Sequence, residues 1–306
     1  MKVLVTGGLG FIGSCVVRLL CDMGHSVVIF DDESSGHNYY DHNLVSVVIG
    51  DITNPSDLDR IPSDVTHCIH LAAAISVAES MQNPEKYMRI NVEGSRNVLQ
   101  WAYEHKLEAM CSASSAAVYG DPIELPLAEE CKLNPISPYA QSKLDMEHLH
   151  VEFFNKGLRT SCFRFFNVFG ERQDPKSDYS GVISKFFYFA KNNLPITIFG
   201  DGEQTRDFVY VQDVANALIL YLLSENSNYD VYNIGTETVT TVNVLAKTII
   251  DVAGATSSIQ YLEARSGDIK HSLSNSSKLK SHLPWQPKMS LQEGLARTYQ
   301  WFLETQ

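Results

Sequence analysis

Short apolar runs alternate with longer segments of helical periodicity over the first 170 residues of the chain. The β-branched and apolar runs predict strands at residues 2–6, 26–30, 45–49, 67–71, 108–113 and 159–166. Between them the pattern predicts helices near 11–23, 84–105 and 138–157, with a short helical turn near 55–60. Alternation at this spacing is typical of a parallel sheet with helices on both faces. We therefore expect a doubly wound α/β fold.

The pattern becomes less regular after about residue 170. The elements expected there are a helix near 180–192, a strand at 195–199, a strand leading into a helix over 207–224, a strand at 229–234, a helix at 241–254, a strand at 258–262 and a final helix at 290–304. We expect two domains. The larger comprises residues 1–168 and about 207–235, and a smaller C-terminal α/β domain comprises about 169–206 and 236–306.

The first predicted strand runs into a glycine-rich turn, residues 7–13, and then into an amphipathic helix. Glycines permit a tight turn and the close approach of a pyrophosphate, and the helix N-terminus offers unpaired N–H groups and a positive dipole end. The second strand ends in Asp31, close to the ~20-residue offset of the carboxylate that binds the adenosine ribose 2′-hydroxyl. Asp32 adds negative charge where a 2′-phosphate would need cations. The sequence therefore predicts a Rossmann domain that binds NAD rather than NADP.

The composition of the chain indicates which binding partners and which cellular compartment to expect. The net charge of −12 argues against a nucleic-acid-binding surface, because phosphate contacts need clustered Lys and Arg. The chain has no basic leader region and no long apolar run, so we expect neither a signal peptide nor a membrane span. The six cysteines show no CxxC spacing and fall mostly inside apolar runs, which is typical of reduced thiols in a cytoplasmic protein without a metal site.

A tyrosine and a lysine four residues apart, Tyr139 and Lys143, share one face of the helix predicted over 138–157. A phenol with a pKa of about 10 is a poor base, but a nearby ammonium and a cationic nicotinamide ring would favour the phenolate. Ser115 follows the strand at 108–113, where a hydroxyl could hydrogen-bond a substrate oxygen. The alternative is a solvent-facing aromatic beside a lysine, with turn-forming serines.

The apolar residues of the same helix do not form one narrow stripe. A helix that is apolar on more than one face is buried on more than one side. We therefore expect a homodimer through the helices near 84–105 and 138–157.

Several motifs occur in one order along nearly the whole chain. They are TGGLGFIG at 6–13, HLAA at 70–73, INVEGSRNVL at 90–99, SSAAVYG at 114–120, SPYAQSK at 137–143, RFFNVFGERQDP at 164–175, GDGEQTRDFVYVQDV at 200–214 and RSGDI at 265–269. With these motifs the chain resembles the extended short-chain dehydrogenases/reductases of the NAD-dependent epimerase/dehydratase family. It most resembles the UDP-hexose 4-epimerases.

The resemblance implies roles for individual residues. Ser115, Tyr139 and Lys143 take the catalytic positions. Positions implied to contact NAD are Gly7, Gly10, Phe11, Ile12, Gly13, Asp31, Asp32, Ser35, Gly36, Asp51, Ile52, Leu71, Ala72, Ala73, Asn91, Tyr139, Lys143 and Phe165. Positions implied to contact a UDP-sugar are Ser76, Ser115, Tyr139, Asn167, Val182, Arg206, Arg265, Asp268 and Ser272. Phe165 stands where many relatives have tyrosine, so a hydrogen bond from that hydroxyl is absent.

The resemblance also implies a reaction. Tyr139 would take the proton of the sugar 4-hydroxyl while C4 passes hydride to NAD, and the 4-ketose would turn over before hydride returns to its other face. Dehydratases of this family usually carry an acidic pair where this chain has Ser115-Ala116. A 4,6-dehydratase is therefore disfavoured, because loss of water would lack an acid or base.

Two features indicate the sugar: the residue at position 272, and the stretch RFFNVFGERQDP at 164–175, which resembles UDP-N-acetylglucosamine epimerases. Ser272 lies seven residues after Arg265, where a large aromatic resembles enzymes restricted to glucose and galactose. A serine leaves room for an N-acetyl group, so we expect UDP-GlcNAc and UDP-GalNAc as substrates, with UDP-Glc and UDP-Gal as further ones. The alternatives are a uronate epimerase, a decarboxylase or a dehydrogenase acting on nucleotide sugars. A catalytically silent NAD-sensing protein is a further alternative, although it would be expected to have lost the Tyr139/Lys143 pair.

Overall fold

The computed structural model describes residues 1–306 except 123, 174–180, 227, 265–268 and 306. Its centre is a parallel sheet in the order β11-β6-β5-β4-β1-β2-β3. The strands are β1 (Lys2–Thr6), β2 (Ser26–Asp31), β3 (Val45–Ile49), β4 (His67–His70), β5 (Ala109–Ser115), β6 (Thr160–Phe165) and β11 (Val231–Ile234). The doubly wound Rossmann fold expected from the sequence is confirmed.

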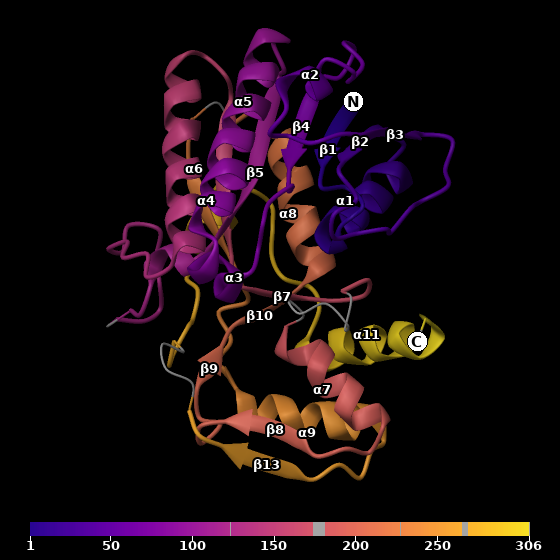
Figure 1. The fold of residues 1–306 in the computed structure, drawn as a ribbon, viewed down its shortest axis with the longest axis vertical. Coiled ribbons are helices and arrows are strands. Elements are labelled where there is room, and N and C mark those ends of the chain that lie inside the picture. The colour runs from indigo at the N-terminus through magenta and orange to yellow at the C-terminus, as the bar shows by residue number, and fades with distance from the viewer. Residues whose placement is uncertain (123, 174–180, 227, 265–268, 306) are drawn as a thin grey trace.

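Helices cover both faces of this sheet (Figure 1). On one face α1 (Phe11–Asp22) and α8 (Val211–Leu223) pack together over a core that includes Val16, Leu20 and Leu218. On the other face lie α5 (Ser95–Glu104) and α6 (Pro138–Asn155), whose apolar residues join a second core. Ser137 begins α6 as predicted, because its hydroxyl accepts a hydrogen bond from the Ala140 N–H at 3.1 Å.

The helix expected over 84–105 is interrupted. It consists of α4 (Pro84–Tyr87), a π-helical turn over Met88–Gly94, and α5. Single π-helical turns inside α-helices occur often at functional sites. Three short helices lie elsewhere in the larger part: α2 (Pro55–Leu58), α3 (Val77–Gln82) and the 3-10 turn at Ala116–Tyr119.

The C-terminal part has its own apolar core, which includes Phe187, Ile198 and Leu245. It contains α7 (Val182–Lys191), α9 (Val242–Ala253), α11 (Leu291–Thr305) and three two-stranded pairs, whereas α10 (Ser277–His282) lies against β11 and its Leu279 joins the core of the large sheet. The pairs are β8 (Ile196–Phe199) with β13 (Ile259–Leu262), β7 (Asn167–Phe169) with β10 (Phe208–Tyr210), and β9 (Thr205–Arg206) with β12 (Thr240–Thr241). The strand expected over 229–234 joins the large sheet as β11.

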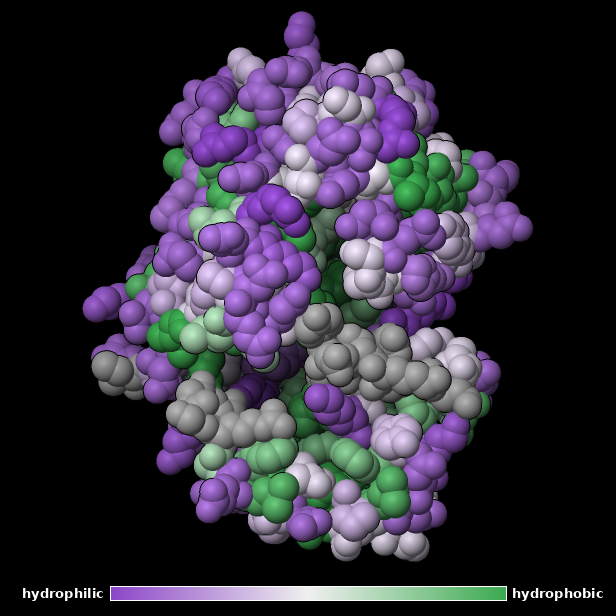
Figure 2. All heavy atoms as spheres, in the orientation of Figure 1, coloured by the Kyte–Doolittle hydropathy of each residue, from purple (hydrophilic) through white to green (hydrophobic). Residues whose placement is uncertain are grey.

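The strand order reverses between β1 and β4, since the chain runs outward from β1 through β2 and β3 before it returns to β4. In doubly wound sheets ligands bind at such a switch point, outside the carboxyl ends of the strands. Figure 2 shows a hollow between the larger and the smaller part of the molecule on this side. Within the part of the chain that the structure describes, no helix is long and apolar enough to cross a membrane.

Candidate active site

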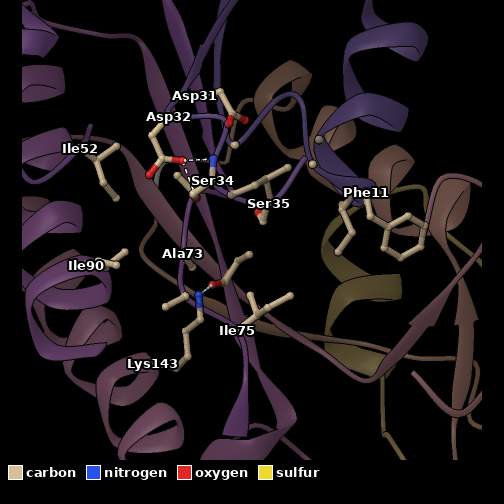
Figure 3. A pocket seen from close by; sticks show the side chains of 18 of the residues that line it. Phe11, Asp31, Asp32, Ser34, Ser35, Ile52, Ala73, Ile75, Ile90 and Lys143 are labelled. Atoms are coloured by element: carbon tan, nitrogen blue, oxygen red, sulfur yellow. Dashed lines mark hydrogen bonds between the residues drawn. The ribbon is translucent and has the colours of Figure 1, made fainter. Parts of the chain in front are cut away.

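A cavity of about 610 Å³ opens at the carboxyl ends of β1, β2, β4, β5 and β6 (Figure 3). Most residues that the sequence analysis assigned to NAD line it: Gly7, Gly10, Phe11, Ile12, Gly13, Asp31, Asp32, Ser35, Asp51, Ile52, Leu71, Ala72, Ala73, Tyr139, Lys143 and Phe165. Ser115 lines it as well. In Figure 3 Asp31 and Asp32 lie at one end of the cavity and Lys143 lies toward the other.

The glycine turn is shaped for close approach of backbone to backbone. Gly7 has a φ of +68°, and a Cβ there would lie 2.7 Å from the amide nitrogen of Ala72. A Cβ on Gly13 would overlap the carbonyl oxygen of Gly7. The N-cap of α1 is Gly10, which has no side chain to occupy the N–H groups of the first helical turn. These groups therefore face the cavity floor as a cradle that fits a pyrophosphate.

Asp31 does two things at the end of β2. Its carboxylate accepts hydrogen bonds from the N–H groups of Leu9 and Glu33, both at 2.9 Å, so it ties the glycine turn to the second strand. Burial raises the pKa of Asp31, while these two backbone hydrogen bonds act in the opposite direction. Each carboxylate oxygen keeps a second lone pair, which fits a ribose hydroxyl.

Tyr139 and Lys143 lie on successive turns of α6 and face the end of β5. Burial raises the pKa of Tyr139, and a hydrogen bond with the Ser115 hydroxyl acts in the opposite direction. The ammonium of Lys143 donates to the Ala113 carbonyl oxygen at 2.9 Å, and burial lowers its pKa from 10.5 to about 8. The chain therefore brings the three catalytic candidates together, but its own groups favour the protonated phenol.

Two residues assigned to NAD do not line the cavity. Asn91, in the π-helical turn, is only 1% exposed. Its side-chain oxygen accepts from the Ala74 N–H at 2.8 Å, and its amide donates to the Ala74 carbonyl at 3.0 Å and to the Ser142 hydroxyl at 2.9 Å. Asn91 therefore holds the wall of the cavity through Ala74. Gly36 lies behind the glycine turn, where a Cβ would overlap the Leu9 carbonyl oxygen.

A second cavity of about 590 Å³ lies between α7, β8 and β9. Asn167, Val182 and Arg206, all assigned to the nucleotide sugar, line it. The two cavities are adjacent, because Phe165, Phe166 and Val168 line the first while Asn167 between them lines the second. A ligand that reaches from Tyr139 to Arg206 would pass over this segment.

Two substrate candidates, Ser76 and Ser272, are not among the residues that line either cavity. Ser76 caps α3 by accepting a hydrogen bond from the Glu79 N–H at 3.0 Å, directly after the cavity residues Ala74 and Ile75. Ser272 pairs with β9, since its N–H donates to the Thr205 carbonyl at 3.2 Å. Arg265 and Asp268 lie outside the described residues.

Comparison with known proteins agrees with this geometry. A model of the NAD dependent epimerase/dehydratase family matches residues 3–235. The chain belongs to this family. It is an enzyme, and NAD is its cofactor.

Three relatives of this epimerase/dehydratase resemble it over almost their whole length. A putative UDP-glucose 4-epimerase of Methanocaldococcus jannaschii is 40% identical over 305 residues, which are 98% of this chain and 97% of that protein. The structure of a UDP-N-acetylglucosamine 4-epimerase from Methanobrevibacter ruminantium, in complex with UDP-N-acetylmuramic acid, has a TM-score of 0.94 and 38% identity, covering 100% of this chain and 99% of the other. A UDP-glucose 4-epimerase from Thermotoga maritima, with UDP-glucose, has a TM-score of 0.95 and 35% identity, with coverages of 100% and 99%.

Sequence reasoning missed several cavity residues of this family member. In the first cavity they are Ser34, Ile75, Glu79, Lys86, Arg89 and Ile90, and in the second Lys185, Phe186, Phe189, Phe199, Gln204 and Leu262. The helical periodicity of 182–191 could have indicated Lys185 and Phe189, because they share a face with Val182. The residues from separate loops had no comparable signal.

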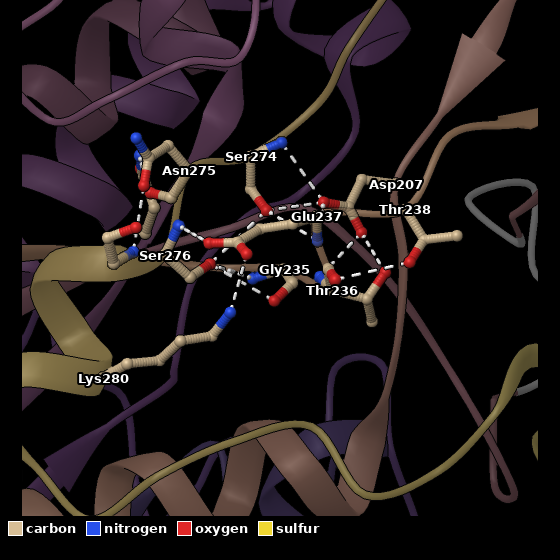
Figure 4. Close-up of polar contacts among 11 residues, drawn as sticks. Asp207, Gly235, Thr236, Glu237, Thr238, Ser274, Asn275, Ser276 and Lys280 are labelled. Carbon is tan, nitrogen blue, oxygen red and sulfur yellow. Dashed lines mark hydrogen bonds and ion pairs between the residues drawn. The ribbon is translucent and has the colours of Figure 1, made fainter.

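A buried carboxylate joins several chain segments beside the second cavity (Figure 4). Asp207, next to Arg206, is completely buried. It accepts hydrogen bonds from the N–H and hydroxyl of Thr236, the N–H of Glu237, and the N–H and hydroxyl of Ser274. Three chain segments are thereby joined beside the second cavity.

Proposed function

We propose that this enzyme interconverts UDP-GlcNAc and UDP-GalNAc by NAD-dependent 4-epimerisation, and that it also accepts UDP-Glc and UDP-Gal. The observation that carries the proposal is the adjacency of two cavities. Tyr139, Lys143 and Ser115 line the one that fits NAD, and Arg206 lines the other. A sugar at their junction would have its reacting carbon beside Tyr139 and its diphosphate toward Arg206.

The proton chemistry falls to side chains of this chain. Once ionised, the Tyr139 phenolate oxygen takes the proton of the sugar 4-hydroxyl and later returns it, and the Ser115 hydroxyl hydrogen-bonds the same sugar oxygen. The ammonium of Lys143 adds positive charge on the same helix face. Bound NAD supplies hydride acceptance from C4 and hydride return to the opposite face. Because burial raises the pKa of Tyr139, ionisation of this phenol requires positive charge beyond that of the unliganded chain.

The remaining assignments concern the substrate. Arg206 binds the diphosphate together with Arg265, since guanidinium groups bind such anions through two hydrogen bonds. The apolar walls of the second cavity, including Phe189 and Leu262, cover the nucleotide. Ser272, on the segment that pairs with β9, leaves space for the N-acetyl group.

The proposal also covers the domains of the chain, its oligomeric state and its cellular compartment. We assign residues 1–168 and 207–235 to the NAD-binding domain, and 169–206 and 236–306 to the nucleotide-sugar domain. Two copies pair through α5 and α6, where Tyr103 and Val151 are exposed. The six cysteines, none of them in a disulfide, agree with a cytoplasmic enzyme.

The decisive experiment is incubation of the purified protein with UDP-GlcNAc, UDP-Glc and UDP-GlcA in separate reactions without added NAD. We expect NMR to show the 4-epimers of the first two and no conversion of UDP-GlcA. Conversion of UDP-GlcA alone would refute the proposal in favour of a uronate-modifying enzyme.

Two variants test the residue roles. Tyr139→Phe should fold, bind NAD and UDP-sugar, and lose nearly all turnover, so activity close to that of the wild type would refute the assignment of the base. Ser272→Tyr should reduce turnover of UDP-GlcNAc far more than turnover of UDP-Glc. Equal losses on the two substrates would refute the role of Ser272 in sugar specificity.

A further inference from the structure

A buried ion pair lies directly behind the proposed catalytic residues. Arg164 on β6 donates to both carboxylate oxygens of Glu147 on α6, at 2.9 Å from Nε and 2.7 Å from Nη2. The two side chains are only 4% and 5% exposed. Burying an ion pair gives little net stability over apolar residues of the same volume, so a pair at this place calls for another explanation.

Glu147, Arg164 and Ser114 each lie close to a residue of the proposed active site. Glu147 lies one helical turn beyond Lys143 and two turns beyond Tyr139. Arg164 precedes Phe165 on β6, and its neighbour in the sheet is Ser114 on β5. The Ser114 hydroxyl donates to Glu147 at 2.5 Å, and Ser114 directly precedes Ser115 in the sequence.

The Nη1 group of the Arg164 guanidinium is also fixed by hydrogen bonds. Arg164 Nη1 donates to the Tyr119 hydroxyl at 2.9 Å and to the Glu129 carbonyl at 3.0 Å. The Tyr119 hydroxyl in turn donates to the side-chain oxygen of Asn233 on β11 at 2.7 Å. Through these hydrogen bonds the Glu147–Arg164 pair links α6 to β5, β6 and β11 immediately behind the cavity.

We propose that Glu147 and Arg164 are positioning residues that fix the distance between the Tyr139/Lys143 face of α6 and the Ser115 end of β5. The proposal rests on the proposed function, because it takes Tyr139, Lys143 and Ser115 as the catalytic groups. A second consequence follows from charge, since the Glu147 carboxylate stabilises the ammonium form of Lys143.

The charged and titratable groups around Lys143 support this second consequence. Burial lowers the pKa of Lys143 to about 8, and the Glu147 carboxylate acts against it, as would a thiolate at Cys162 on β6. Burial raises the pKa of the Cys162 thiol well above its usual range, so this thiol carries no charge at neutral pH. On β4, burial and the charge of Lys143 lower the pKa of His70 to about 3, so His70 is neutral as well. Glu147 is thus the anion that acts on Lys143 among these neighbours, with Arg164 as its counter-charge.

The phenols nearby do not alter this balance. Burial raises the pKa of Tyr119 to about 12 and the pKa of Tyr229 beyond that. Both phenols are therefore neutral at neutral pH. The Tyr229 hydroxyl donates to the backbone carbonyl of Glu147 at 3.2 Å, so it adds a further hold on α6 without adding charge.

The test compares Glu147→Gln with Glu152→Gln on the same helix, which removes the exposed ion pairs of Glu152 with Arg96 and Lys156. For Glu147→Gln we expect kcat to fall about 10- to 100-fold, the size of effect that displacement of a catalytic group by about 1 Å produces. KM for the UDP-sugar should change less than about twofold, because the second cavity is untouched. The alkaline limb of the kcat profile should move about 1 pH unit lower, since Lys143 loses a nearby anion. Glu152→Gln should match the wild type in all three.

A second variant covers failure of Glu147→Gln to fold and separates distance from charge. Glu147→Asp keeps the carboxylate but cannot reach Ser114 and Arg164 as before. We expect a low kcat with an alkaline limb at the pH of the wild type. Wild-type kcat and limb in the folded Glu147 variants, with only a lower melting temperature, would overturn the proposal. If Tyr139→Phe keeps full activity the proposed function fails, whereas an inactive Tyr139→Phe beside fully active Glu147 variants refutes only the positioning role.

Discussion

Replacement of Asp207 by asparagine should destabilise the substrate side of the enzyme. In the wild type, Oδ1 accepts from the N–H and hydroxyl of Thr236 at 2.8 and 2.7 Å. Oδ2 accepts from the N–H of Glu237 at 3.0 Å, and from the N–H and hydroxyl of Ser274 at 3.2 and 2.5 Å. A carboxylate suits this site because every group around it donates, and backbone N–H groups cannot reverse their direction.

An asparagine amide cannot satisfy the same donors. If the asparagine nitrogen faces Thr236, the N–H of Thr236 has no acceptor. If the amide is turned the other way, the N–H groups of Glu237 and Ser274 both have no acceptor. A buried unsatisfied N–H costs about 1–3 kcal/mol, and the remaining hydrogen bonds lose the added strength of a charged acceptor. We expect Asp207→Asn to lower the free energy of unfolding by about 4 kcal/mol, which for a chain of this length corresponds to about 6 °C in Tm.

The local effect should reach the substrate and spare the cofactor. Asp207 follows Arg206 directly, and the N–H of Asn167 donates to the Asp207 carbonyl at 3.0 Å. Both neighbours line the second cavity. We therefore expect KM for the UDP-sugar to rise at least about tenfold, from the loss of about 1.4 kcal/mol of binding. The NAD content of the purified protein should not change, because the glycine turn belongs to the large sheet.

The assay combines thermal unfolding, steady-state epimerisation and the NAD content of protein released by denaturation. The matched control is Asp201→Asn, an exposed carboxylate that accepts from the Glu203 N–H at 3.0 Å, and it should leave Tm and KM near their wild-type values. An Asp207→Asn protein with the Tm and KM of the wild type would refute the reasoning. Loss of NAD with an unchanged KM would show that the network serves the other cavity.

Three further predictions follow from single contacts. Gly13→Ala should push α1 away from Gly7 and abolish retention of NAD. Gly24→Ala adds backbone strain at a φ of +78° but places its Cβ in open space, so it should retain NAD; equal NAD content in both variants would contradict the cradle. Burial lowers the pKa of His150 from 6.5 to about 3, so only the unfolded state takes up this proton as pH falls below 6.5. Between pH 7.5 and pH 5 the wild type should therefore lose about 2 kcal/mol of unfolding free energy through this group, and His150→Gln should lack this loss. An unchanged dependence of the unfolding free energy on pH in denaturant unfolding would contradict the prediction. Val151 is 39% exposed on α6, so Val151→Asp should convert the proposed dimer to a monomer in light scattering, and a persistent dimer would place the interface elsewhere.

Much of the fold could be predicted because its signals are local. Each long element has a period or an end signal of its own, such as the glycines at 7–13 or Ser137 before Pro138. β7, β9 and α3 were missed, because they have only three, two and six residues and lack the apolar, β-branched run that marked the other short strands. The π-helical turn was missed because helical periodicity does not reveal one extra residue in a turn.

The sequence by itself determined the chemistry that depends on neighbours along the chain. It determined the cradle at the start of α1, the acidic end of β2, and a phenol and an ammonium on one face of α6. These features need only the geometry of a turn, a strand end or a helix. That Asn91 supports the cavity wall and does not line it was decided by the contact of a π-helical turn with Ala74.

Only the tertiary structure decided which distant segments meet. It placed Arg164 beside Glu147 through the pairing of β5 with β6, and it joined residues 207, 236 and 274 around one carboxylate. It also made residues 165–168 a common wall of two cavities. Such contacts depend on strand order and on the packing of separate segments. Neither leaves a pattern within the segment itself, because a buried arginine or aspartate has the same neighbours in sequence whether or not its partner is close.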